Sequence, residues 1–93
     1  GELLTRPFTM SGTRLKLNLE TSAAGSIRVE IQTPAGEPLD GYQATDCHLL
    51  FGDSLERVVE WKRGSDLSAL SGVPLRLRIL IKGADLYALQ FTP

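Results

Sequence analysis

The chain has 93 residues, 42% of them hydrophobic, which is enough for one small domain with a single core and too few for a second. Ten basic and eleven acidic residues leave a net charge of −1, which excludes a general electrostatic attraction to nucleic acid or to an anionic membrane surface. The most apolar stretch is interrupted by Arg76, Arg78 and Lys82, so no segment is predicted to span a bilayer.

Apolar and polar residues alternate along most of the chain, and this period of two predicts β-strands. Gly, Pro, Asp and Ser separate the alternating runs at intervals of about 10 residues, which is typical of antiparallel sandwiches and barrels. In chain order, the predicted strands are Leu3–Met10, Leu15–Leu19, Ile27–Ile31, Leu39–Tyr42, Cys47–Phe51, Leu55–Trp61, Leu75–Ile81 and Tyr87–Phe91. A hairpin turn is expected at Gly83–Asp85, and one short helical connector within Ser65–Gly72. The predicted fold is therefore all-β: a single antiparallel β-sandwich over residues 1–93, jelly-roll-like, with about eight strands.

The polar face of the strand Ile27–Ile31 is predicted to be ordinary solvent surface. Arg28 and Glu30 on this strand, with Arg76 and Arg78 on a later one, form rows of mixed charge. Such rows suit cross-strand pairing and discourage aggregation at sheet edges. They form no single-sign stripe that would identify a ligand.

In the predicted strand Leu55–Trp61, the alternation of apolar and polar residues is irregular and places the cation Arg57 on the apolar face. If Val59 and Trp61 face the core, Arg57 faces it too, unless a bulge near Val58 changes the phase. A half-buried Arg57 needs an acid nearby, and Asp46 and Asp53 are the candidates. An ion pair at this corner is predicted to be structural rather than catalytic.

No pattern of residues predicts catalysis or a bound metal. Cys47 and His48 are adjacent, but neighbours on a strand point to opposite faces, so we expect a buried thiol beside an exposed imidazole. One Cys and one His do not make a zinc site, and the aspartates are scattered singly along the loops rather than grouped as calcium ligands. No catalytic residue, metal or cofactor is therefore predicted.

A sugar-binding surface would need exposed aromatic rings. The chain has six aromatic residues, and Tyr87, Phe91 and Trp61 each share a strand face with aliphatic residues, which favours the core. Tyr42 lies in loop-like sequence, and Trp61 lies next to the loop Lys62–Asp66. Tyr42 and Trp61 are the candidate carbohydrate-binding residues.

The segments AGSIRVEIQ, GDSLERVVEW, DLSALSG and ADLYALQF, which span most of the chain, give it a family resemblance. They resemble the C-terminal β-sandwich module of planctomycete-type bacterial proteins related to glycoside hydrolase family 32, whose catalytic domain is a β-propeller. The family pattern has Asp-Cys-Asp where this chain has Asp46-Cys47-His48, which weakens any acid or metal site in this loop. The resemblance implies an accessory domain beside a catalytic domain, in an exported parent protein, and it transfers no catalytic residue.

Two functions follow as expectations. The first is a non-catalytic accessory module, excised from a longer protein, that packs against a neighbouring catalytic domain of the same chain. The alternative is a carbohydrate-binding module. An apolar patch on one face would favour domain packing, whereas exposed rings at Tyr42 and Trp61 would favour sugar binding.

Overall fold

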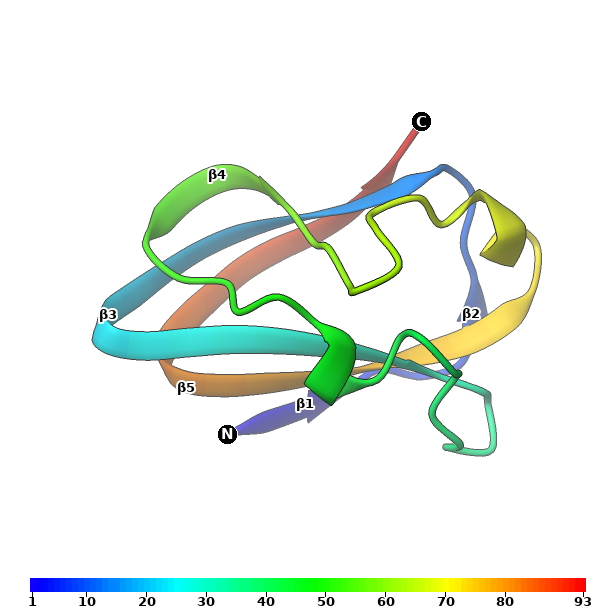
Figure 1. The fold of residues 1–93 in the computed structure, drawn as a ribbon, viewed down its shortest axis with the longest axis horizontal. Coiled ribbons are helices and arrows are strands. Elements are labelled where there is room, and N and C mark those ends of the chain that lie inside the picture. The colour runs from blue at the N-terminus through cyan, green and yellow to red at the C-terminus, as the bar shows by residue number, and fades with distance from the viewer.

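A computed structural model describes residues 1–93, and it is all-β with antiparallel pairing, as predicted (Figure 1). The strands are β1 (Glu2–Leu4), β2 (Phe8–Thr9), β3 (Arg14–Gln32), β4 (Asp53–Val58) and β5 (Pro74–Thr92). Two short 3₁₀ turns, Ala44–Asp46 and Ser68–Leu70, are the only helical segments. The second lies inside the predicted connector Ser65–Gly72 and confirms it.

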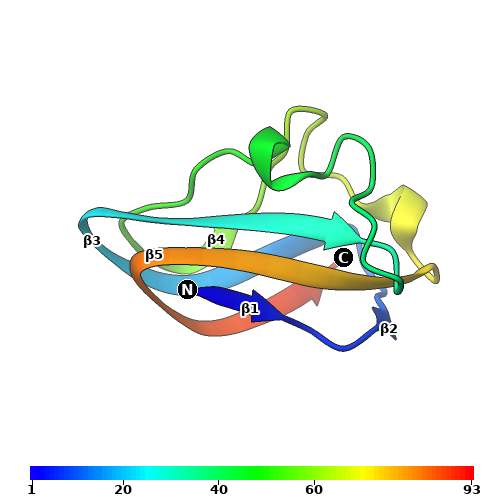
Figure 2. The same cartoon turned by 90° about the horizontal axis from the view of Figure 1, so that it is seen from below.

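The strands β3 and β5, each 19 residues long, dominate the fold. They pair from Arg14↔Thr92 at one end to Gln32↔Arg76 at the other, and both turn back on themselves near the middle (Figures 1 and 2). The bend divides the sheet into two arms. Arm A contains residues 14–21 of β3, residues 84–92 of β5, and β4, whereas arm B contains residues 26–32 of β3, residues 74–82 of β5, and β1.

The bend depends on a close approach of two glycines. Between the pairs Thr21↔Ala84 and Ser26↔Lys82, β3 has four residues where β5 has only Gly83. A Cβ atom at Gly25 would lie 2.1 Å from the carbonyl oxygen of Gly83, so no larger residue fits there without movement of the backbone. The predicted hairpin turn at Gly83–Asp85 is therefore wrong: Gly83, with φ of +53°, lies within the bend of a continuous strand.

The hydrophobic core fills the space between the two arms. The alternating residues predicted to face inward are buried along β3 and from Leu75 to Ile79 of β5, whereas Tyr87 and Leu89 on the second half of β5 are exposed. Side chains from the connecting loops complete the core. The fully buried members are Leu15, Leu17, Ile27, Val29, Val59, Trp61, Leu67, Leu77 and Ile79, each with 0% exposure. Each buried aliphatic side chain of this size contributes about 1.5–3 kcal/mol to folding.

The structure has five strands rather than about eight. Leu15–Leu19 and Ile27–Ile31 are two halves of β3, and Leu75–Ile81 and Tyr87–Phe91 are two halves of β5. The predicted strand Leu39–Tyr42 is a turn, and the predicted strand Cys47–Phe51 is an irregular loop with isolated bridges at Cys47 and Leu50. The 3₁₀ turn Ala44–Asp46 lies between them.

The sheet order is β1-β5-β3-β4, which leaves one edge of β5 free. β1 pairs with residues 78–80 of β5 and β2 with residues 74–75, both in arm B. In arm A, residues 84–92 of β5 pair with β3 alone. A row of backbone groups along this half of β5 therefore has no strand beside it.

Candidate functional site

Two β-bulges lie opposite the same residues of β3. On β4, Leu17 pairs with Arg57 and Leu19 with Ser54, so Leu55 and Glu56 together lie opposite one residue of β3. On β5, Asn18 pairs with Ala88 and Leu19 with Leu86, which leaves Tyr87 as the extra residue. Bulges of this kind redirect side chains and are frequent beside functional sites.

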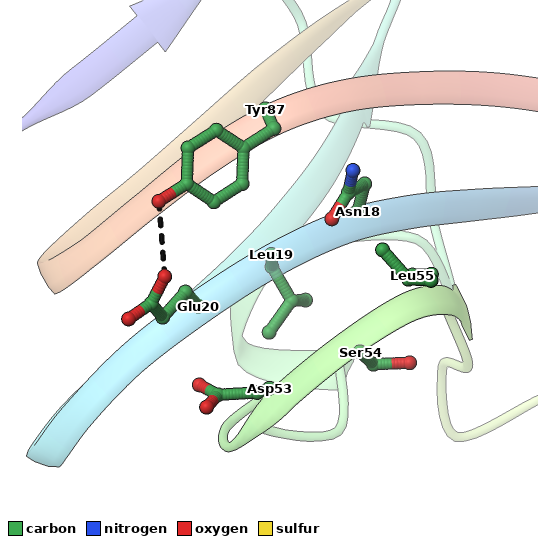
Figure 3. Close-up of a pocket in the computed structure, with 7 residues that line it drawn as sticks. All are labelled: Asn18, Leu19, Glu20, Asp53, Ser54, Leu55 and Tyr87. Carbon is green, nitrogen blue, oxygen red and sulfur yellow. Dashed lines mark hydrogen bonds between the residues drawn. The ribbon is translucent and has the colours of Figure 1, made fainter.

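The two bulges turn Leu55 and Tyr87 outward on either side of β3. Leu55 is 80% exposed and Tyr87 is 60% exposed, although both belong to strands. Between them lies an open hollow of about 410 Å³ on the outer surface of arm A (Figure 3). It is lined by Asn18, Leu19, Glu20, Asp53, Ser54, Leu55 and Tyr87, and we call it the outer-face hollow.

The outer-face hollow is acidic and rich in hydrogen-bonding groups. The Tyr87 hydroxyl donates to Glu20 Oε2 at 3.0 Å, which is the only side-chain hydrogen bond among the lining residues (Figure 3). This hydrogen bond and the negative charge of Glu20 raise the pKa of Tyr87, because ionisation of the phenol would place a second negative charge beside the carboxylate. Asp85 and Asp53 act in the same direction. No lysine or arginine lines the hollow.

Apolar side chains on β1, on β2 and on the free half of β5 remain partly exposed and form a second candidate surface. Leu3 pairs with Ile79 and Leu89 with Leu17, so both point toward the core side, yet they remain 42% and 36% exposed because no further strand covers them. The Phe8 and Phe91 rings pack beside each other with centroids 5.7 Å apart. We call the residues Leu3, Phe8, Leu86, Leu89 and Phe91 the apolar flank.

The candidate sugar-binding residues Tyr42 and Trp61 do not form an exposed surface. Tyr42 is 4% and Trp61 is 0% exposed, and their rings pack edge to face with centroids 5.6 Å apart. The guanidinium of Arg63 lies 4.8 Å from the centroid of the Tyr42 ring. Both rings belong to the core, so the pair of exposed rings expected at a sugar-binding surface is not found at Tyr42 and Trp61.

The structure separates the residues of the predicted ion pair. Arg57 is half-buried and lies opposite Leu17 on the core side of β4, with its guanidinium near Gly52, and it forms no salt bridge. Asp46 accepts a hydrogen bond from the backbone of Gln43 at 3.1 Å, and Asp53 lines the outer-face hollow. The bulge lies at Leu55–Glu56 rather than near Val58.

The polar face of the second half of β3 is more buried than predicted. Glu30 and Gln32 are each 5% exposed, and the Gln32 amide donates to Glu30 Oε2 at 2.7 Å. The backbone of Ala44 donates to Glu30 at 3.2 Å, and Arg78 forms a salt bridge with Glu30 at 3.5 Å. Arg76 donates to Gln32 at 2.8 Å.

These contacts determine the protonation of Glu30. Burial by itself raises the pKa of Glu30, but the hydrogen bonds from Gln32 and Ala44 and the charge of Arg78 outweigh it, so the pKa is lowered. The cross-strand charge pairing predicted for this face is present between Glu30 and Arg78. The face was also predicted to be exposed to solvent, but Glu30 and Gln32 on it are buried. The network holds the loop around Ala44 against β3.

Cys47 is 5% exposed and His48 is exposed, as predicted from their adjacent positions. The Cys47 sulfur accepts a hydrogen bond from the backbone of Val29 at 3.4 Å, and burial raises the pKa of the thiol. No group of three or more His, Cys, Asp or Glu side chains is arranged to hold a metal ion. No helix of the structure is long and apolar enough to cross a membrane.

No family model, curated protein or solved structure matches this chain.

Proposed function

We propose that residues 1–93 form a non-catalytic accessory module that packs its apolar flank against a neighbouring catalytic domain of the same chain. In this proposal the two arms act as the layers of a small, jelly-roll-like β-sandwich. The resemblance to modules that accompany β-propeller catalytic domains supports a β-propeller as the kind of neighbour.

The observation that carries the proposal is the position of the apolar flank beside a free strand edge. Leu3 and Leu89 point toward the core side of their strands and remain partly exposed. From Leu86 to Thr92, β5 contains no charged residue, no proline and no glycine. Natural edge strands usually carry such protective residues, so an uncharged edge beside exposed apolar side chains supports an interface with another protein surface.

The opposite edge of the sheet, formed by β4, is charged rather than apolar. β4 carries Asp53, Glu56 and Arg57 within six residues, and a bulge interrupts its pairing with β3. Both margins contain a bulge, but charges also prevent edge-to-edge association, and β5 has none from Leu86 to Thr92. The contrast supports docking at the apolar flank rather than at β4.

Photo-crosslinking in the natural polypeptide that contains this module tests the proposal. A benzoylphenylalanine residue in place of Leu89 should crosslink to a peptide of the neighbouring domain, identified by mass spectrometry. The same residue in place of Glu56, on the β4 margin, is the control and should give no such crosslink. Crosslinks from position 89 that remain within residues 1–93, or a natural polypeptide without any further domain, would contradict the proposal.

A further inference from the structure

We propose that the outer-face hollow is a binding site for an uncharged pyranose sugar, with Tyr87 as the stacking ring. The hollow is on the outer surface of arm A, whereas the apolar flank is at the margin beside β1. The inference therefore stands independently of the proposed docking.

A specific irregularity of the backbone, the bulge in β5, exposes Tyr87. Leu86, Leu89 and Phe91 pair with the core-facing residues of β3, and Tyr87 is the one residue between them that the bulge leaves unpaired. The extra residue turns the ring outward over the hollow, where it is 60% exposed (Figure 3). Core packing does not require an outward-facing tyrosine at this point of the strand.

The lining of the outer-face hollow combines apolar and hydrogen-bonding groups, as a sugar site requires. A pyranose ring has an apolar face of C–H groups, which packs against an aromatic ring, and an edge of hydroxyls, which needs hydrogen-bond partners. The Tyr87 ring and Leu55 supply apolar surface on two sides of the hollow. Asn18 lies between Tyr87 and Leu55, whereas Asp53 and Ser54 lie on β4 with Leu55 (Figure 3). The side chains of Asn18, Asp53 and Ser54 form no hydrogen bond with one another.

The negative charge of the outer-face hollow restricts the class of sugar that it could bind. Glu20 and Asp53 both line the hollow and no cation does, so uronic acids and sulfated sugars would meet like charges. Carboxylates are strong acceptors for the hydroxyls of an uncharged sugar. The Glu20 carboxylate already orients the Tyr87 hydroxyl through their 3.0 Å hydrogen bond. Because one ring and an open hollow bury little surface, we expect a Kd on the order of 1 mM.

Titration of the ¹⁵N-labelled chain, followed by NMR, tests the inference. The probes are uncharged cello-, xylo- and manno-oligosaccharides up to about 20 mM, with oligogalacturonate as the anionic comparison. At least one uncharged series should cause saturable shifts of the amide signals of Asn18, Ser54, Leu55 and Tyr87, and oligogalacturonate should cause none. The absence of saturable shifts with all three uncharged series would overturn the inference, as would equal binding of oligogalacturonate.

Two variants locate the site. Tyr87→Ala should weaken the binding at least tenfold, whereas Phe51→Ala should leave it unchanged, because Phe51 is an equally exposed ring (61%) outside the hollow. The NMR spectrum of each variant reports whether the fold is intact. Equal loss of binding in both variants, or unchanged binding in Tyr87→Ala, would contradict the assignment. A failure of sugar binding would leave the crosslinking result at Leu89 unaffected, so the two proposals fail separately.

Discussion

The indole nitrogen of Trp61 donates a hydrogen bond to the backbone carbonyl of Val29 at 2.9 Å, and both residues are fully buried. This contact joins the irregular segment after β4 to the second half of β3, across the interior of the fold. A buried tryptophan needs a partner for its N–H group, and here the partner is a strand carbonyl.

Removal of this donor should destabilise the protein. Trp61→Phe keeps an aromatic ring but leaves the Val29 carbonyl without its partner, and it also removes buried volume. We expect the free energy of unfolding to fall by about 1–3 kcal/mol in urea denaturation followed by circular dichroism. Tyr87→Phe, at an exposed ring, is the control and should change it by less than about 0.5 kcal/mol. Equal stability of Trp61→Phe and the wild type would show that this hydrogen bond contributes little.

The bend of the two long strands depends on Gly25. Gly25→Ala would place a methyl group against the carbonyl oxygen of Gly83, so the backbone of one strand would have to move. We expect a loss of about 1–3 kcal/mol in the free energy of unfolding. Ala24→Ser, at the neighbouring exposed position, should change stability by less than about 0.5 kcal/mol. A Gly25→Ala variant with wild-type stability would mean that the two strands are farther apart at the bend.

Glu30 should make the stability depend on pH in the acid range. Its pKa in the folded protein is below the ordinary value of 4.5, so the unfolded chain binds a proton more readily. The stabilisation is therefore present above about pH 4.5 and is lost as the pH falls through the folded pKa. Urea denaturation from pH 7 to pH 3 should show a smaller acid-dependent loss in Glu30→Gln than in the wild type.

The same substitution should be costly at neutral pH. Glu30→Gln removes the charge that faces Arg78 and disturbs the acceptors for Gln32 and Ala44, so we expect a loss of about 1–3 kcal/mol at pH 7. Glu37→Gln, at an exposed position, should change stability at pH 7 by less than about 0.5 kcal/mol. Parallel pH profiles for Glu30→Gln and the wild type would argue against the network around Glu30.

The Cys47 thiol should be unreactive in the folded protein. It is 5% exposed, and burial raises its pKa, so little thiolate forms at pH 8 and reagents have poor access to it. Reaction with Ellman's reagent should be slow for the folded chain and fast in urea. The double variant Cys47→Ser, His48→Cys moves the thiol to the neighbouring exposed position and should react rapidly without urea. Fast reaction of the folded wild type would contradict the buried position of Cys47.

The sequence predicted the parts of the fold that depend on local alternation. The inward positions of Leu15, Leu17, Ile27, Val29 and Leu77 follow from a period of two, and all five are buried. The continuity of the two long strands was not predictable in this way. A glycine near a polar residue indicates a turn, whereas Gly83 allows a bend within a strand that pairs on both sides of it.

The candidate site was predicted poorly because one extra residue reverses a strand's phase. Tyr87 shares the alternation of Leu89 and Phe91, which favours the core, and only the pairing of β5 with β3 shows that a bulge exposes it. Trp61 was placed near a loop by its sequence neighbours, but contacts with distant residues bury it. No local pattern reports either effect.

The central claim, that the apolar flank is covered by a neighbouring domain, is most directly tested by amide hydrogen exchange. Exchange along residues 84–92 of β5 would be compared between the isolated 93-residue chain and the natural polypeptide that contains it. We expect these amides and those of β1 to exchange more slowly in the longer polypeptide, while the amides of β4 exchange at the same rate in both. Equal exchange along residues 84–92 in the two proteins would contradict the claim.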